Sequence, residues 1–192
     1  MPTGIELAPL AEQVKKYVGL GAHDLLGLSA DAYAAGLLTV TVKVPEGYPS
    51  RFAIPVLVDA RLPIELLLLK AGIKSFLDLA AVDNAVGDSK TAYLMWTHDS
   101  HRYYGLCPID AQSKFVPDEV GCTLLELVAF FCQFPRAFSG IAMDALLSRF
   151  RGEYHPSLIG VTSRPEIASH WYKDVTPGMN TLSKGKTVQV LS

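Results

Sequence analysis

The sequence lacks the features that would place the chain in a membrane or on nucleic acid. No apolar run approaches the ~18 residues that cross a bilayer, and the longest candidates, 66–69 and 127–132, are short. The start, Met1 to Gly4, has neither the basic residues nor the apolar core of a secretion signal. Basic residues are scattered, the net charge is −2 and the pI is near 6.2. We therefore expect a cytoplasmic protein that binds neither membranes nor nucleic acid.

Cysteine is also scarce, and its spacing excludes two common uses. Cys107, Cys122 and Cys132 have neither the spacing of a zinc site nor the even number of a disulfide framework. The Gly-x-Ser-x-Gly nucleophile motif and the glycine-rich phosphate-binding motifs are missing too. We expect reduced, buried thiols and no cofactor.

Apolar residues, in contrast, are abundant. Of the 192 residues 49% are hydrophobic and the mean hydropathy is +0.24. A chain of this length buries about 70% of its unfolded surface, so a large core is expected. We predict a single domain over 1–192, with a helical subregion over 1–38 and an α/β body over 39–192.

One segment, Pro117 to Pro135, is predicted to be a buried helix around which the rest packs. Pro117 suits a first helical turn, and Asp118 and Glu119 place negative charge at the positive end of the helix dipole. Apolar side chains cover most of the circumference, which leaves one narrow polar stripe. Such a helix requires neighbours on most sides.

The other elements follow from hydrophobic periodicity and from turn residues. The predicted fold class is α/β or α+β: a small mixed β-sheet with a β-hairpin packed against the central buried helix, and flanking helices. A crossover from the strand at 51–59 into the helix beginning at Pro63 is part of this prediction. Further helices are expected over 5–18, 23–28, 31–38 and 141–150, a strand or extended segment over 39–44, strands over 158–162, 170–175 and 187–191, and the hairpin over 91–97 and 102–107.

A first candidate for chemistry is a cluster in the predicted hairpin turn. His98, Asp99 and His101 are residue types that bind zinc. Two histidines three residues apart in a turn need not face one ion, and no second ligand motif accompanies them. We favour a solvated turn over a metal site.

The segment from Arg164 to Thr181 is the most suggestive for function because it places polar side chains beside aromatic ones. It contains acid–base candidates, a guanidinium suited to anions, and rigid amphipathic rings. A structural interpretation, in which the aromatic residues anchor the segment and the charges form ion pairs, is the alternative. The catalytic candidates are His170, Glu166 and Asp174, and the binding candidates are Arg164, Trp171, Tyr172 and Asn180.

Glu126 is the one carboxylate in the middle of the predicted central helix. If the polar stripe is covered, burial would raise the pKa of this carboxyl, as in many general bases. If the stripe meets water, Glu126 is a surface residue. We favour an exposed or hydrogen-bonded structural role.

Several short motifs recur in a known order, mainly in the C-terminal half. They are Phe115–Thr123, Gln133-Phe134-Pro135, Ser148-Arg149, Arg164-Pro165-Glu166 and the run from Trp171 to Ser183. In this order the chain resembles an uncharacterised bacterial family known only as a domain of unknown function. The resemblance implies a bacterial cytosolic protein in which 117–183 form one unit, and it carries over no activity and no catalytic residue.

Two functional hypotheses remain. The first is a binding or interaction module without catalysis, with an unknown protein or small-molecule partner and self-association into a homo-oligomer as one option. The alternative is a small-molecule enzyme, a hydrolase, that uses the polar and aromatic segment 164–181.

Overall fold

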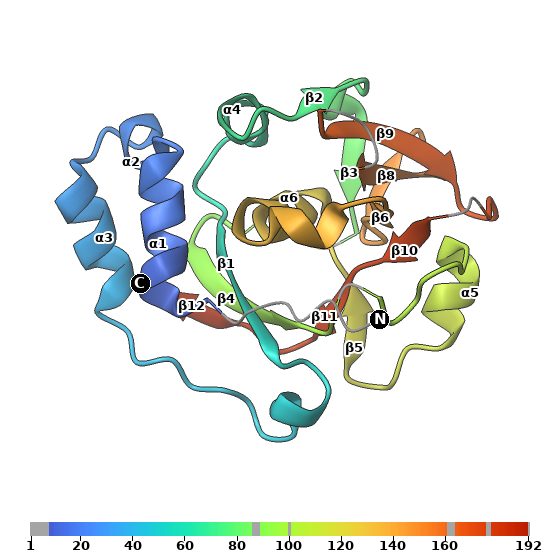
Figure 1. Ribbon diagram of the computed structural model, residues 1–192, viewed down its shortest axis with the longest axis horizontal. Coiled ribbons are helices and arrows are strands. Elements are labelled where there is room, and N and C mark those ends of the chain that lie inside the picture. Colours follow the sequence, from blue (N-terminus) through green and yellow to red (C-terminus); the bar gives the residue numbers. More distant parts are fainter. Residues whose placement is uncertain (1–7, 86–88, 100, 161–163, 176–177, 192) are drawn as a thin grey trace.

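The computed structural model describes residues 8–85, 89–99, 101–160, 164–175 and 178–191. The chain forms two β-sheets with helix α6 (Leu124–Gln133) between them, and three N-terminal helices pack beside the first sheet (Figure 1). The predicted class, a mixed α and β fold around a central buried helix, is confirmed. None of the helices in the described part of the chain has the length and apolar character needed to cross a bilayer.

The N-terminal helices are α1 (Leu10–Gly19), α2 (Ala22–Leu25) and α3 (Ala30–Leu38). The Ser29 hydroxyl caps α3 by accepting the Ala32 N–H at 3.1 Å, as the sequence predicts. The predicted start of the first helix near Ile5 lies outside the described residues.

The first sheet is antiparallel throughout. Its order is β1–β4–β11–β5, and β12 also pairs with β4. Pro55 is tolerated because β1 is an edge strand. The side chain of Gln13 on α1 covers this edge: it donates to the Pro55 carbonyl at 2.9 Å and accepts the Leu57 N–H at 2.7 Å. The strands are β1 (Ile54–Asp59), β4 (Ala92–Thr97), β5 (Glu119–Gly121), β11 (Ser183–Gly185) and β12 (Gln189–Leu191).

The second sheet is mixed. Its order is β10–β6–β8–β7–β3, and β9 pairs with β8 and β2. The chain passes from this sheet to the first one at buried Leu182, between β10 and β11. The strands are β2 (Lys74–Ser75), β3 (Val82–Asn84), β6 (Ala142–Asp144), β7 (Ser148–Phe150), β8 (Tyr154–Ile159), β9 (Glu166–Trp171) and β10 (Met179–Thr181).

Helix α6 is shorter than the predicted helix from Pro117 to Pro135. Thr123 and Glu126 form a reciprocal capping box, so the helix begins only at Leu124. The residues before it are extended because Glu119–Gly121 pair with β11. The prediction that Pro135 ends the helix is confirmed, since a 3₁₀ turn follows over Pro135–Phe138. Two further 3₁₀ turns occupy Tyr48–Ser50 and Leu79–Ala81.

The predicted helix over 141–150 is wrong. Its apolar residues fit a helical period, but the segment forms β6 and β7, which pair with β8. Met143 lies opposite Leu158 in this pairing, and both are fully buried. Tertiary pairing therefore overrides the local pattern.

The predicted strand over 102–107 is also wrong. Residues 101–105 are turns, because β4 already has β1 on one side and β11 and β12 on the other. Consecutive antiparallel strands occur instead at β7 with β8 and at β8 with β9, and β8 and β9 are displaced from the predicted strands at 158–162 and 170–175. Residues 39–44 contain no strand: Thr39 lies in a turn with helical backbone angles, Val40 is in a bend, and 41–44 are irregular.

The predicted crossover does not form within one sheet. Helix α4 (Ile64–Lys70) begins after Pro63 and ends before Gly72 as expected, but β1 and β2 belong to different sheets. The helical turn expected after Pro108 is present as α5 (Pro108–Ser113).

Candidate small-molecule binding site

Strand register places a group of polar side chains on the face of the first sheet that meets α6. Lys184 on β11 lies opposite Thr97, and Val190 on β12 lies opposite Tyr93. Opposed residues of neighbouring strands share a face, as do alternate residues along one strand. Tyr93, Lys184 and Val190 therefore point to the same side.

The opposite face of this sheet fixes β11 in place. The Tyr48 ring lies directly on Gly185, where an added Cβ would come within 2.3 Å of it. The Tyr48 hydroxyl also accepts the Thr187 N–H at 2.9 Å. Lys184 is thus held on a strand supported from behind.

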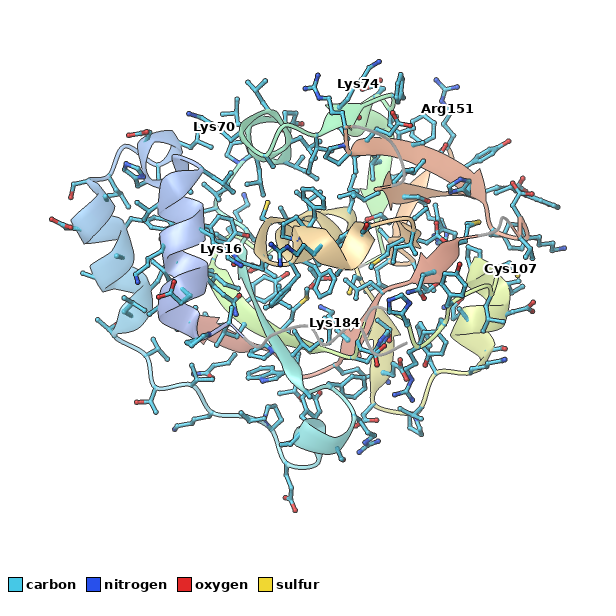
Figure 2. The ribbon with its side chains drawn as sticks, in the orientation of Figure 1. Lys16, Lys70, Lys74, Cys107, Arg151 and Lys184 are labelled. Carbon is cyan, nitrogen blue, oxygen red and sulfur yellow. The ribbon has the colours of Figure 1, made fainter. Side chains whose placement is uncertain are left out.

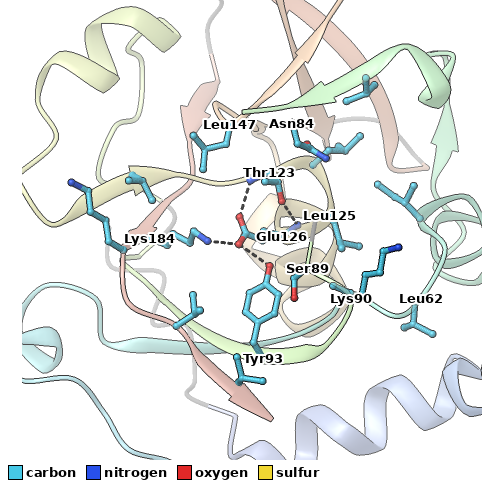
Figure 3. A pocket seen from close by; sticks show the side chains of 18 of the residues that line it. Leu62, Asn84, Ser89, Lys90, Tyr93, Thr123, Leu125, Glu126, Leu147 and Lys184 are labelled. Atoms are coloured by element: carbon cyan, nitrogen blue, oxygen red, sulfur yellow. Dashed lines mark hydrogen bonds and ion pairs between the residues drawn. The ribbon is translucent and has the colours of Figure 1, made fainter. Parts of the chain in front are cut away.

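A cavity of about 660 Å³ opens above this face (Figure 3). It is bounded by the first sheet, the N-terminal end of α6, and residues around α4 and β3. Exposed side chains such as Lys90 and Val190 are part of its lining, so it reaches the surface. The aliphatic lining residues are Ala60, Leu62, Ile64, Leu79, Val82, Val120, Leu124, Leu125, Leu147, Val188 and Val190.

Glu126 lies at the centre of a buried polar cluster in this cavity. One carboxylate oxygen, Oε2, accepts the Thr123 N–H at 2.8 Å. The other, Oε1, accepts the Tyr93 hydroxyl at 2.9 Å and contacts the Lys184 ammonium (Figure 3). Glu126 is 1% exposed and Lys184 8%. The carboxylate is therefore a hydrogen-bonded, buried group with a matched cation.

The electrostatics of the cluster keep its neighbours protonated. Burial raises the pKa of Tyr93, and the adjacent Glu126 raises it further. The pKa of the Cys122 thiol is raised by the same two causes, in the same order. Tyr93 is thus a hydrogen-bond donor, and Cys122 is an unreactive core thiol.

Lys184 differs from the lysines elsewhere on the chain. Lys70 and Lys74 are exposed and project from the outline of the molecule, as does Arg151 (Figure 2), whereas the Lys184 side chain is buried. A buried lysine is rare unless it is paired, and Glu126 is the partner here.

The predicted catalytic residue His170 belongs to a second buried cluster. Its Nδ1 lies 2.8 Å from the Ser157 hydroxyl and 3.6 Å from Asp144 Oδ1, and the Ser157 hydroxyl donates to Asp144. The neighbouring carboxylate raises the pKa of His170, and partial burial opposes this effect. The Ser157 hydroxyl lies between Asp144 and His170, whereas in a catalytic triad the histidine lies between the serine and the acid. Ser157 is also 0% exposed. This arrangement is not that of a Ser–His–Asp triad.

The other candidates expected near His170 are the acid–base residues Glu166 and Asp174 and the binding residue Arg164. Arg164 is exposed and donates to the Gly72 carbonyl at 2.9 Å, and Glu166 lies opposite Lys74 at the start of β9. Asp174 is exposed, close enough to His170 to add to its raised pKa. None of Arg164, Glu166, His170 and Asp174 lines the cavity.

The predicted binding residues Trp171, Tyr172 and Asn180 separate into two places. The Trp171 and Tyr172 rings meet edge to face with centroids 5.2 Å apart, and Trp171 is 38% exposed. Asn180 is fully buried, and its side-chain oxygen accepts the Thr181 N–H at 2.8 Å. Asn180 is thus a core residue.

The predicted metal candidates also diverge. His98 is buried, accepts the Ser183 N–H at its Nε2 at 3.3 Å, and has a pKa lowered by burial. Asp99 and His101 are exposed and bonded to each other, with the His101 N–H donating to the Asp99 carboxylate at 2.8 Å. Within the described residues, no three His, Cys, Asp or Glu side chains gather as a metal site.

Sequence reasoning singled out Glu126 but missed its partners. Lys184 stands in a stretch, Ser183–Gly185, that has no strong strand pattern of its own, and Tyr93 reads as an ordinary aromatic of a buried strand. Only pairing between distant strands brings the three together. Comparison with known proteins adds nothing further, because no family model, curated protein or solved structure matches this chain.

Proposed function

We propose that this protein is a binding module without catalysis, and that its partner is a small molecule held in the cavity above Glu126. The observation that carries the proposal is the pairing of an aliphatic cavity of about 660 Å³ with a buried Glu126–Lys184–Tyr93 cluster. Small-molecule sites are typically concave, about 300–1,000 Å³ in volume, mainly apolar, and supplied with a few fixed polar groups.

The contacts inside the cluster favour binding over chemistry. Glu126 accepts from the Thr123 N–H, the Tyr93 hydroxyl and the Lys184 ammonium, so most of its acceptor capacity is used within the protein. A general base needs a lone pair directed at the substrate. Here the carboxylate holds its neighbours in position instead.

The hydrolase alternative has less support. Its strongest residue, His170, bonds to Ser157, which is fully buried and therefore out of reach of a substrate. The proposed pocket does not include the segment on which that alternative rests.

The test uses the full chain and the neutral fluorescent probe N-phenyl-1-naphthylamine, whose emission rises in apolar sites. We expect saturable binding that Val190→Trp weakens at least about tenfold, because the new ring fills part of the cavity. Val175→Trp is the matched control: Val175 is also exposed, but it lies outside the lining. Absence of saturable binding, or equal affinity in both variants, would contradict the proposal.

Self-association is a separate part of the proposal. Tyr154 and Trp171 lie opposite each other on β8 and β9, and both are exposed. Exposed aromatic pairs are common at protein interfaces. Light scattering of the wild type and Trp171→Ala at high concentration tests this: two monomers would remove the hypothesis.

A further inference from the structure

We infer that the ligand of this cavity is an aliphatic acid, with its chain along the aliphatic walls and its anionic head at Lys184. The inference rests on the proposed function, since it names the class of molecule that the same cavity takes.

The walls favour a flexible aliphatic chain over a planar ring. Of the described residues that line the cavity, eleven are alanine, valine, leucine or isoleucine, and one, Tyr93, is aromatic. Tyr93 directs its hydroxyl to Glu126 and contributes no pair of rings between which a base could stack. Nucleotide and aromatic cofactor sites use such stacking. An acyl chain requires only apolar contact.

The charges of the lining favour an anion. Among the described residues, three lysines, Lys90, Lys184 and Lys186, line the cavity against one carboxylate, Glu126. The positive N-terminal end of α6 adds to this balance, because Glu126 lies in the first turn of that helix. Lys186 donates to the Pro117 carbonyl at 2.6 Å, so Lys90 at the rim and Lys184 at the floor are the cations we assign to the ligand.

Lys184 also retains donor capacity. An ammonium carries three N–H donors. Within the described part of the chain, Glu126 is the one acceptor in hydrogen-bond contact with it. Buried donors seek acceptors, and a carboxylate head would supply two oxygens beside Lys184.

The experiment measures displacement of N-phenyl-1-naphthylamine by four ten-carbon compounds: decanoate, decyl phosphate, decanol and decyltrimethylammonium. We expect decanoate to bind at least about tenfold more tightly than decanol, as a charge-assisted contact requires, with the cation weakest. A decyl phosphate that binds more tightly than decanoate identifies a phosphate as the head group. If decanol binds as tightly as decanoate and decyl phosphate, or if decyltrimethylammonium binds most tightly, the inference is overturned.

Chain length supplies a second measurement. Each methylene that contacts the walls should tighten binding about fourfold, from hexanoate upward until the cavity is full. Affinities that do not change with chain length would overturn the assignment of the walls to an acyl chain.

Two variants test the head group. Glu126→Gln preserves a capping-box residue type but removes the negative charge beside Lys184. We expect the ratio of decanoate to decanol affinity to rise about three- to tenfold. Lys90→Glu should lower that ratio, whereas Lys114→Glu, an exposed lysine outside the lining, should leave it unchanged although the net charge changes equally.

These outcomes separate the two proposals. If the neutral probe binds and Val190→Trp blocks it, but the head group makes no difference, the cavity is a binding site and the aliphatic-acid assignment is wrong. If the probe does not bind, the proposed function itself fails.

Discussion

Two buried carboxylates, Glu126 and Asp144, are each paired with a cationic side chain but differ in their surroundings. Each lies beside a cationic side chain, Lys184 for Glu126 and His170 for Asp144. Glu126 accepts donors at both oxygens and lines a cavity, whereas Asp144 Oδ2 has no hydrogen-bond partner among the described residues. The Glu126 carboxylate thus has a protein donor at each oxygen, whereas the Asp144 carboxylate has one at Oδ1 only in the described part of the chain.

The difference lies in the cation. A lysine ammonium stays charged across neutral pH, so its removal leaves the carboxylate without compensation. An imidazole titrates near neutral pH and can lose its proton when its partner is lost. His170 also reaches solvent, with 20% of its side chain exposed. We therefore expect the Glu126 pair to be costly to break, and the Asp144 pair to be milder, with a pH dependence that comes from His170.

The largest expected effect is that of Lys184→Met. It leaves Glu126 charged and buried without a cation, which should cost about 3–5 kcal/mol of unfolding free energy. Urea denaturation monitored by Trp fluorescence measures this loss. The double variant Lys184→Met/Glu126→Leu is the control, because removing both charges should restore much of the stability. A single variant as stable as the wild type would show that the pair is not desolvated.

Asp144→Asn should cost less, about 1–3 kcal/mol. The amide retains the shape and can still accept from the Ser157 hydroxyl, and His170 can become neutral once the carboxylate is gone. The same denaturation measurement at pH 7 checks it. If Asp144→Asn proves more damaging than Lys184→Met, the ranking of the two clusters is reversed and the comparison fails.

Thr123→Ala separates the cap of α6 from the charge pair. It removes the hydroxyl that accepts the Glu126 N–H at 3.3 Å, and the loss of such an N-cap typically costs about 1 kcal/mol. Ser29→Ala, which removes the equivalent cap of α3, is the matched comparison. Equal losses in the two variants would indicate that Thr123 contributes only a cap, whereas a much larger loss would indicate that it also supports the Glu126 cluster.

The parts of the fold that depend on local signals could be predicted from the sequence. The caps and ends of α3 and α4, the strand at Ile54–Asp59 and the terminal strand follow from turn residues and apolar runs. The segment Ile141–Phe150 could not be predicted locally, because its apolar spacing fits a helix and only its pairing with β8 makes it a strand.

The candidate site shows the same limit more clearly. The sequence singled out Glu126 but left open whether it is exposed or buried, because its partners come from 33 and 58 residues away. The charged and aromatic residues between Arg164 and Asn180 are close in sequence but do not form one site, since Asn180 is in the core and Trp171 is at the surface. Proximity along the chain was the misleading signal.

The smallest effect is the pH dependence of the His170 contribution, and its sign follows from linkage. Asp144 raises the pKa of His170 above its ordinary value of about 6.5. The stabilisation from this pair is therefore complete below about pH 6.5 and is lost as the pH rises through the raised value. We expect the wild type to exceed His170→Gln in unfolding free energy by more at about pH 5.5 than at about pH 8.5.

This effect is visible only in the difference in unfolding free energy between the wild type and His170→Gln. Burial lowers the pKa values of His98 and His155, so these two side chains stabilise the fold less as the pH falls. They oppose His170 in the total curve. The contribution of His98 cancels in the difference, and so does that of His155 except for its coupling to Asp144, because His155 lies opposite His170. A difference between wild type and His170→Gln that is constant from acid to alkaline pH would mean that Asp144 does not hold His170 as a cation. The contrast between the two carboxylates would then rest on the cavity alone.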